Sequence, residues 1–237
     1  MIELIDICFE RDNKKILNNI NLKLDKNKFY VITGQNGSGK STLVKIIMGI
    51  IKPDSGKILL DGEDITNLCI NERANLGIGF AFQQPVKFKG ITVYDLLSFA
   101  SNKQINKKEA CDILSKVGLC ALEYIDREVN KSLSGGELKR IEIATVLARK
   151  PRIAIFDEPE AGIDLWSFRN LNKIFKQISD DNNSMTLVIS HQEKILNMAD
   201  KVILMENGNI VNFDSCENVM NSIISKPCCK KEEIYNG

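Results

Sequence analysis

The apolar residues in the first part of the chain follow the period of β-strands. Ile20, Leu22 and Leu24 alternate with polar residues, which is typical of a strand with one face in water. Turn-forming residues follow at Lys52–Gly56, and Asp61–Gly62 has the character of a hairpin turn. The pattern therefore predicts a strand-rich layer in the N-terminal third of the protein.

A helical period replaces the strand period in the middle of the chain. A strand that begins at Gly77 is expected to end near Gln84, before a proline, and helices are expected from Val93 to about Lys150. One of these helices has apolar residues at the spacing i, i+3, i+4 and i+7, namely Ala110, Ile113, Leu114 and Val117. Gly118 lies at its expected end. We predict an inserted helical subdomain over residues 85–150.

Strands and a helix alternate again in the last part of the chain. Ile153–Phe156 and Thr186–Ile189 are short apolar runs of the kind found in buried strands, and an amphipathic helix lies between them. Asn207–Gly208 predicts a late hairpin. This alternation favours an α/β fold with a mostly parallel sheet covered on both faces. Its core would comprise residues 1–84 and 151–237, with residues from about 226 to 237 forming a loosely ordered tail.

The composition excludes several classes of function. Lys and Arg total 32 of the 237 residues against 31 Asp and Glu, so the overall charge gives no reason to expect nucleic acid as a partner. No apolar run approaches the ~18–20 residues of a membrane span, so we expect no direct membrane insertion. The seven cysteines are scattered without a C-x-x-C pair, which favours reduced thiols and a cytoplasmic location over disulfides or zinc.

The strongest motif is the stretch from Gly34 to Ser41, which matches the phosphate-binding loop pattern in full. It lies between an apolar strand and a helix start, where backbone N–H groups and the helix dipole favour an anion. This context favours a triphosphate site over an ordinary Gly/Ser-rich loop. Lys40 is expected to reach the β- and γ-phosphates of ATP, and Ser41 to bind Mg²⁺. The residues expected to bind the nucleotide here are Gly34, Asn36, Gly37, Ser38, Gly39, Lys40, Ser41 and Thr42.

Two carboxylates follow the buried strand Ile153–Phe156. Asp157 has the chemistry to bind Mg²⁺, and Glu158 is placed to orient or deprotonate an attacking water. The structural alternative is that one of them caps a helix N-terminus.

Ser134-Gly135-Gly136 is a second glycine-rich helix start and a second potential phosphate site. One chain does not need two such sites for one γ-phosphate unless two chains share the nucleotide. Alone, this motif would be no more than a flexible N-cap.

The motifs together resemble the ATP-binding-cassette (ABC) ATPases in order and approximate spacing, from about Ile2 to about Phe213. The resemblance implies a P-loop NTPase of ABC type, with a mixed sheet core, an N-terminal antiparallel β layer and the inserted helical subdomain. It also implies hydrolysis of ATP with Mg²⁺ and a homodimer that forms on ATP.

The resemblance assigns roles to further residues. Gln83 resembles the Q-loop glutamine that senses Mg²⁺ and water, and His191 resembles the switch histidine on the γ-phosphate. Ser134, Gly135 and Gly136 resemble the signature that closes on the partner chain's ATP, and Asp164 resembles the D-loop aspartate across the dimer. The resulting catalytic set is Glu158, His191 and Gln83, and the metal set is Ser41, Gln83 and Asp157.

The chain departs from the family pattern in two places. An aromatic residue usually stacks on adenine, but the aligned position is Arg11 and the nearest aromatic is Phe9, so either could serve. Glu137 replaces the commoner glutamine of the signature, a change that leaves the backbone donors intact.

Within the family, the segments Ala81–Val86 and Gly135–Ile143 are similar to those of SufC-type ATPases, which serve SUF-type iron-sulfur cluster assembly; Pro159 is more common in transporter motors. We therefore expect a SufB/SufD-like scaffold as partner, with transmembrane permease subunits as the alternative and a non-enzymatic binding module as a third possibility. Cys228 and Cys229 are interpreted as reduced thiols in the tail.

Overall fold

A mixed sheet of six strands forms the centre of the molecule. In this computed structural model, residues 1–82, 88–101, 104–130, 132–161, 165–180 and 184–224 are described. The strands lie in the order β10-β9-β3-β8-β7-β6. All neighbouring pairs are parallel except β9 and β10, which form the predicted late hairpin. The six strands are β3 (Phe29–Thr33), β6 (Ile78–Ala81), β7 (Ile153–Asp157), β8 (Met185–Ile189), β9 (Lys201–Glu206) and β10 (Asn209–Asp214).

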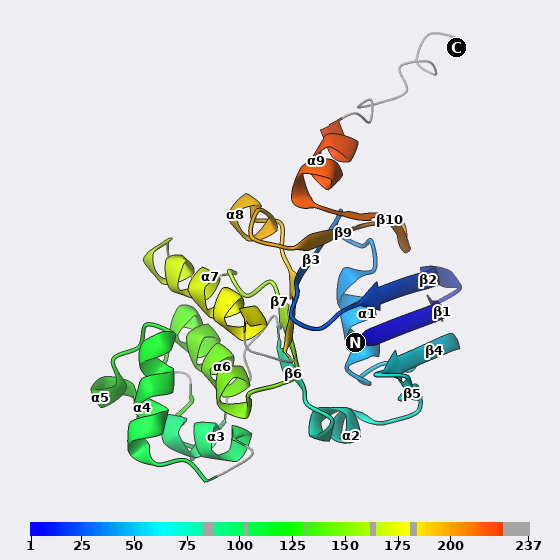
Figure 1. The fold of residues 1–237 in the computed structure, drawn as a ribbon. Helices are drawn as coiled ribbons and strands as arrows, with labels where there is room; N and C mark the ends of the chain where they lie inside the picture. Colours follow the sequence, from blue (N-terminus) through cyan, green and yellow to red (C-terminus); the bar gives the residue numbers. More distant parts are fainter. Residues whose placement is uncertain (83–87, 102–103, 131, 162–164, 181–183, 225–237) are drawn as a thin grey trace, which may run out of the picture.

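The central strands are buried on both faces, which explains their continuous apolar sequences. Every residue of β3 and β7 is buried. On β3, Phe29 and Val31 pack into one apolar core, whereas Tyr30 and Ile32 pack into a second core on the opposite face. Helices α6 (Gly135–Arg149) and α7 (Leu165–Asp180) contribute to the first core, and α1 (Lys40–Ile47) contributes to the second (Figure 1).

A separate antiparallel sheet completes the second core. Its strand order is β2-β1-β4-β5, and it contains the predicted N-terminal layer. At the Asp61–Gly62 turn, Leu60 pairs with Glu63, which confirms the predicted hairpin. The four strands are β1 (Ile2–Arg11), β2 (Lys14–Leu24), β4 (Ser55–Leu60) and β5 (Glu63–Asp64).

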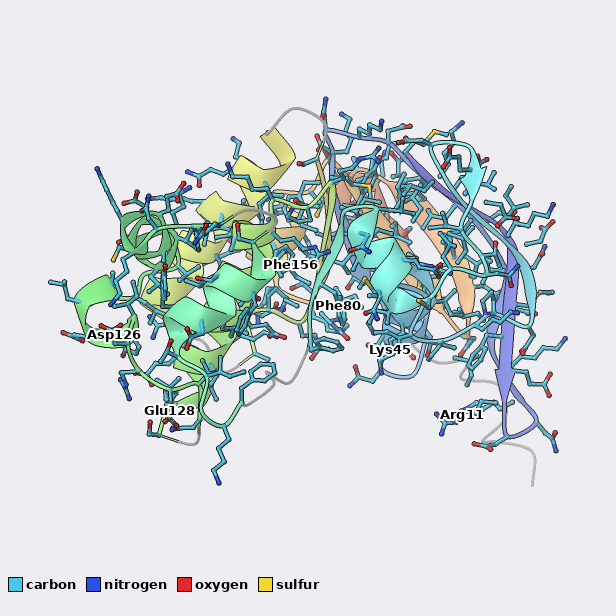
Figure 2. The ribbon with its side chains drawn as sticks, turned by 90° about the horizontal axis from the view of Figure 1, so that it is seen from below. Arg11, Lys45, Phe80, Asp126, Glu128 and Phe156 are labelled. Atoms are coloured by element: carbon cyan, nitrogen blue, oxygen red, sulfur yellow. The ribbon has the colours of Figure 1, made fainter. Side chains whose placement is uncertain are left out.

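The helices of the middle region gather at one end of the molecule, beside β6 and away from the antiparallel sheet (Figure 1). They are α3 (Val93–Ala100), α4 (Lys107–Lys116), α5 (Ala121–Tyr124) and α6. Gly118, which follows the C-cap residue of α4, has φ of 74°, as expected of a residue that ends a helix. Figure 2 shows the separation: Asp126 and Glu128 lie on the helical side, Arg11 lies at the tip of the antiparallel layer, and Phe80 and Phe156 lie between them.

Three further helices were not predicted from the sequence: α2 (Ile70–Asn75), α8 (Glu193–Leu196) and α9 (Cys216–Ile224). The burial of Arg73 fixes α2 in place. Its guanidinium donates to the carbonyl oxygens of Ile46 and Ile47 at the end of α1, at 2.7 and 2.8 Å. Among the described residues, no helix combines the length and the apolar character that crossing a membrane requires.

The sheet also determines where a site can form. Because β3, β7 and β8 are parallel neighbours, their carboxyl ends meet at one edge of the sheet. The loop from Gly34 to Gly39 follows β3, Glu158 follows β7, and Ser190 and His191 follow β8. Ligands of open α/β sheets bind at such carboxyl ends.

Candidate functional site

The phosphate loop is shaped by glycines in conformations that other residues seldom adopt. Gly34 has φ of 140°, and a Cβ added there would lie 2.0 Å from the carbonyl oxygen of Met205. Gly39 has φ of 99° and forms the N-cap of α1. The backbone can therefore pass close to β9 and turn directly into the helix.

The turn between β9 and β10 supports this loop by a hydrogen bond, and β2 supports the turn. The N–H of Gly208, in the turn between β9 and β10, donates to the carbonyl oxygen of Ser38 at 3.1 Å. The carbonyl oxygen of Gly208 in turn accepts from the N–H of Asn18 on β2 at 2.9 Å. The loop is thus held between the two sheets, as a preorganised anion site requires.

Lys40 is the first residue of α1, and its side chain folds back over the loop. Nζ donates to the carbonyl oxygens of Gly34 at 2.7 Å and Gln35 at 2.9 Å. Burial lowers the pKa of Lys40, and the charges of Glu158 and Asp157 oppose this shift. The lysine therefore lies within electrostatic reach of both carboxylates that the sequence singled out.

Ser41 and Asp157 lie together as a metal site requires. The Oγ atom of Ser41 is 3.5 Å from Oδ1 of Asp157. Asp157 is only 3% exposed, and this burial raises its pKa. Two oxygen donors of this kind suit Mg²⁺, which commonly takes its remaining ligands from phosphates and water. Among the described residues there is no group of three His, Cys, Asp or Glu that could hold a metal ion.

Glu158 has an unusual backbone conformation for a residue with a side chain. Its φ is 46°, and its N–H donates to the carbonyl oxygen of Ile189 at 3.0 Å. A left-handed conformation at a non-glycine residue costs about 1–3 kcal/mol and is concentrated at functional sites. This turn directs the chain away from the end of β7 immediately after Asp157.

His191 lies at the end of β8, near the phosphate loop. Its Nδ1 atom is 3.5 Å from Oγ1 of Thr33, the last residue of β3. Burial and the charge of Lys40 lower the pKa of His191, while the charge of Glu158 raises it. The structure therefore brings Lys40, Asp157, Glu158 and His191 to one edge of the sheet.

The signature motif begins α6 in a well-defined way. Ser134 and Glu137 form a reciprocal capping box, in which the Ser134 N–H donates to Oε2 of Glu137 at 2.7 Å. The hydroxyl of Tyr124 donates to the other carboxylate oxygen of Glu137. Glu137 thus stabilises the helix start, while Gly135 is exposed, with open space around the position of an added Cβ.

Two sequence-predicted residues, Gln83 and Asp164, lie outside the described residues. Of the two candidates for adenine stacking, Phe9 packs against the apolar core beneath the antiparallel sheet. The side chain of Arg11 is 75% exposed (Figure 2). This arrangement leaves Arg11 the more accessible of the two.

Sequence reasoning missed the interactions of three side chains: Thr33, Glu160 and Lys139. Thr33 contacts His191, as described above. Glu160 accepts a hydrogen bond from the hydroxyl of Ser190. Lys139, buried in α6, donates to the carbonyl oxygen of Phe82 and pairs with Glu142 at 3.3 Å. The position of Glu160, two residues after Glu158, was a signal that it lies near the site. The sequence around Lys139 contains no signal that this lysine is buried.

The fold and this set of residues define the class: the protein is a P-loop NTPase that hydrolyses ATP. A family model described as ABC transporter matches residues 17–161, more than half of the chain. The chain belongs to this ABC ATPase family. A nucleotide-free ATP-binding cassette from an ABC transporter is 28% identical in sequence, with a TM-score of 0.80 over 100% of this chain and 99% of that one.

Relatives in the family differ in the roles their names give. An uncharacterized ABC transporter ATP-binding protein, MJ0035 of Methanocaldococcus jannaschii, is 39% identical over 89% of this chain and 87% of its own length. The iron-sulfur cluster assembly protein SufC of Plasmodium falciparum is 36% identical over 84% of this chain and 61% of its own length.

Proposed function

We propose that this protein is a Mg-ATP-dependent ATPase that forms a dimer on ATP and drives a conformational change in a SufB/SufD-like iron-sulfur cluster assembly scaffold. The observation that carries the ATPase part is the meeting of Lys40, Ser41, Asp157, Glu158 and His191 at one edge of the sheet. The choice of scaffold rests on sequence similarity to SufC-type ATPases.

The side chains divide the chemistry between them. Lys40 exchanges the carbonyl oxygens of Gly34 and Gln35 for the β- and γ-phosphates of ATP, while the N–H groups of the loop bind the same phosphates. Ser41 and Asp157 would hold Mg²⁺, which supplies positive charge to the phosphate oxygens. The lowered pKa of His191 favours a neutral ring at pH 7, able to donate one hydrogen bond to the γ-phosphate.

Glu158 is the general base of this proposal. Its carboxylate lies close enough to Lys40 and His191 to affect the pKa of both. A positioned base contributes ~10²- to 10⁴-fold in rate. Glu158→Gln should therefore lower kcat by at least about 100-fold and leave nucleotide binding largely intact. Phosphate release and equilibrium nucleotide binding, measured on the same preparations, test this; an equal loss in both would contradict the role.

Two chains are needed to complete each site. Ser134 caps α6, which begins with Gly135 and Gly136. The described hydrogen bonds of the three residues stay within this helix start: Ser134 bonds with Glu137 and Leu138, and the carbonyl oxygen of Gly136 accepts from Nε of Arg140. The N-terminus of α6 therefore remains available to the triphosphate of a second chain. In such a closed dimer, the phosphate loop of one protomer and the signature of its partner would enclose each nucleotide, with Gln83 and Asp164 adding the contacts that the resemblance implies.

Mixing two defective variants tests the shared site. Lys40→Ala removes the phosphate ligand of one chain, and Ser134→Arg blocks the signature of the other. Each variant alone should be inactive, and the mixture should recover part of the activity because a mixed dimer contains one intact pair. A Lys116→Ala variant mixed with Lys40→Ala serves as a control for simple dilution, since Lys116 lies on α4 outside the proposed site. A mixture as inactive as its components would contradict the shared site.

The proposed function also includes the part of the chain that contacts the partner. We propose that the chain is divided into a core of residues 1–84 and 151–237 and a helical subdomain of residues 85–150. The helical subdomain would contact the partner. A transporter role is the second candidate, favoured by the name of the 39% identical relative. Co-purification with a soluble scaffold in the absence of detergent would support the first, and recovery only with an integral membrane protein would support the second.

A further inference from the structure

The segments that follow β7 and β8 lie side by side at the site edge of the sheet. In the parallel register Asp157 pairs with Ile189, and the N–H of Glu158 extends the pairing by one more hydrogen bond, 3.0 Å to the carbonyl oxygen of Ile189. Residues 158–160 therefore run beside residues 190–192. The first segment carries the proposed general base, and the second carries His191.

A buried serine connects the two segments. Ser190 has no exposed surface, and its hydroxyl donates to Oε1 of Glu160 at 2.5 Å. The same oxygen of Ser190 accepts from the N–H of Gln192 at 3.0 Å. The backbone N–H of His191 also stabilises the ionised form of Glu160. Glu160 is therefore bonded to Ser190, the residue that precedes His191, and the same hydroxyl of Ser190 continues to the N–H of Gln192 on the other side of the histidine.

The fold keeps Glu160 in place at a cost. Burial raises its pKa, and the negative charge of Glu158 adds to this effect. Its second oxygen, Oε2, is buried without a hydrogen-bond partner in the described part of the chain. An unsatisfied buried polar group costs about 1–3 kcal/mol. Such a group beside catalytic residues is a candidate for a functional role.

The histidine ring needs the fixed orientation that this backbone contact provides. The residue is exposed overall, and the described contact of its ring is the one between Nδ1 and Thr33 Oγ1, at 3.5 Å. A single contact at this distance does little to restrain an imidazole that must meet a phosphate oxygen. The position of the Cα atom, and hence the backbone held by Glu160, therefore determines where the ring can reach.

We propose that Glu160 is a positioning residue that fixes His191 for ATP hydrolysis, and that it acts through this histidine alone. The proposal deepens the function above and rests on the role given there to His191. It does not depend on which partner the protein serves.

A double-mutant cycle tests the kinetic part. Glu160→Ala and Ser190→Ala should each lower kcat by about 10- to 100-fold, the loss expected when an orienting partner is removed, with KM for Mg-ATP little changed. Glu160→Gln should retain most of the activity, because its amide oxygen still accepts from Ser190. In a His191→Ala background, Glu160→Ala should cause no further loss. Glu193→Ala, an exposed acid at the start of α8, is the matched control.

A titration that needs no activity tests the same link. His191 is the single histidine of the chain, so its ring signals in an NMR pH titration are assigned without ambiguity. Ser190→Ala changes no charge and should move the His191 pKa upward, towards its ordinary value of 6.5, as the ring leaves its partly buried position near Lys40. Lys40 and Glu158, whose charges act on the ring, and Thr33, which contacts it, are unchanged in this variant.

The outcomes separate this inference from the proposed function. If the wild-type protein hydrolyses ATP but Glu160→Ala lowers kcat equally with and without His191, Glu160 does not act through the histidine and the inference is overturned. An unchanged His191 titration in Ser190→Ala overturns it as well. If Glu160→Ala does not fold, Ser190→Ala in the same cycle decides. A failure of the wild-type protein to hydrolyse ATP contradicts the proposed function, while the titration still decides the inference.

Discussion

At the scale of single residues, the glycines of the phosphate loop differ in what they make possible. At Gly34 an added Cβ would meet the carbonyl oxygen of Met205, whereas at Gly37 it would meet nothing within 4 Å. Both have positive φ, 140° and 81°. The same motif therefore contains one position where space is limiting and another where only backbone conformation matters.

This difference predicts unequal effects of the same substitution. Gly37→Ala should cost only the strain of a left-handed residue, about 1 kcal/mol of the free energy of unfolding. Gly34→Ala adds a clash with backbone that cannot move without displacing β9, so we expect a loss of about 2–4 kcal/mol. Urea denaturation of the two variants measures both values. Equal losses would show that the contact with Met205 is not limiting.

Asp157 illustrates a conflict between function and stability at one residue. Burial raises its pKa from 3.8, so the folded state holds the proton more tightly than the unfolded state. The ionised carboxylate therefore destabilises the folded protein by its full amount above the pKa of the folded state. This destabilisation disappears as the pH falls below about 4.

Asp157→Asn should consequently stabilise the protein while abolishing hydrolysis. At pH 7 and without nucleotide or Mg²⁺, we expect a gain of about 1 kcal/mol, which corresponds to a rise in Tm of about 2–4 °C for a chain of this size. The gain should shrink as the pH approaches 4. Thermal unfolding at a series of pH values measures this, and a lower Tm at pH 7 would contradict the cause given for the pKa shift.

At the scale of elements, a buried ion pair joins α6 to the end of β6. Lys139 and Glu142, one turn apart on α6, have side chains that are 1% and 12% exposed. Lys139 donates to the carbonyl oxygen of Phe82, and Glu142 accepts from the Phe82 N–H at 2.6 Å. The helix thus binds both backbone groups of the residue where β6 has ended.

Removing one charge of this pair should destabilise the fold strongly. Lys139→Met leaves Glu142 buried without its cation, a change that typically costs about 3–5 kcal/mol. The double variant Lys139→Met, Glu142→Gln removes the uncompensated charge and keeps an acceptor for Phe82, so it should recover much of the loss. Urea denaturation of both variants provides the comparison. A double variant no more stable than Lys139→Met would show that the charge pair is not the source of the stability.

The elements also show how far the sequence could predict this structure. The buried strands and the phosphate loop were predictable, because continuous apolar runs and a full glycine motif are local signals. The α2 helix was not, since it depends on Arg73 reaching carbonyl groups of α1 that are 26 and 27 positions away in the sequence. The roles of Lys139 and Glu160 were missed for a related reason: each binds a residue that is distant in the sequence, Phe82 and Ser190 respectively, and a charged residue in the sequence predicts exposure.

At the scale of the whole molecule, the two glycine-rich helix starts belong to different elements, α1 after β3 and α6 in the helical region (Figure 1). If each nucleotide requires one of each from separate chains, the rate of hydrolysis per chain should rise with protein concentration until the dimer dominates. Phosphate release measured over a range of protein concentrations at saturating Mg-ATP tests this. A rate per chain that is independent of concentration, in a protein that sedimentation shows to be a monomer throughout, would mean that one chain suffices.

The position of Lys40 has a consequence for the kinetics of such a cycle. Its ammonium group already donates to the carbonyl oxygens of Gly34 and Gln35, so these contacts restrict the conformations of the loop before any nucleotide arrives. Capture of ATP then requires only an exchange of acceptors around a fixed cation, without a slow ordering step. If the meeting of two loaded protomers is slower than this exchange, a partner that brings the protomers together would raise the rate of hydrolysis.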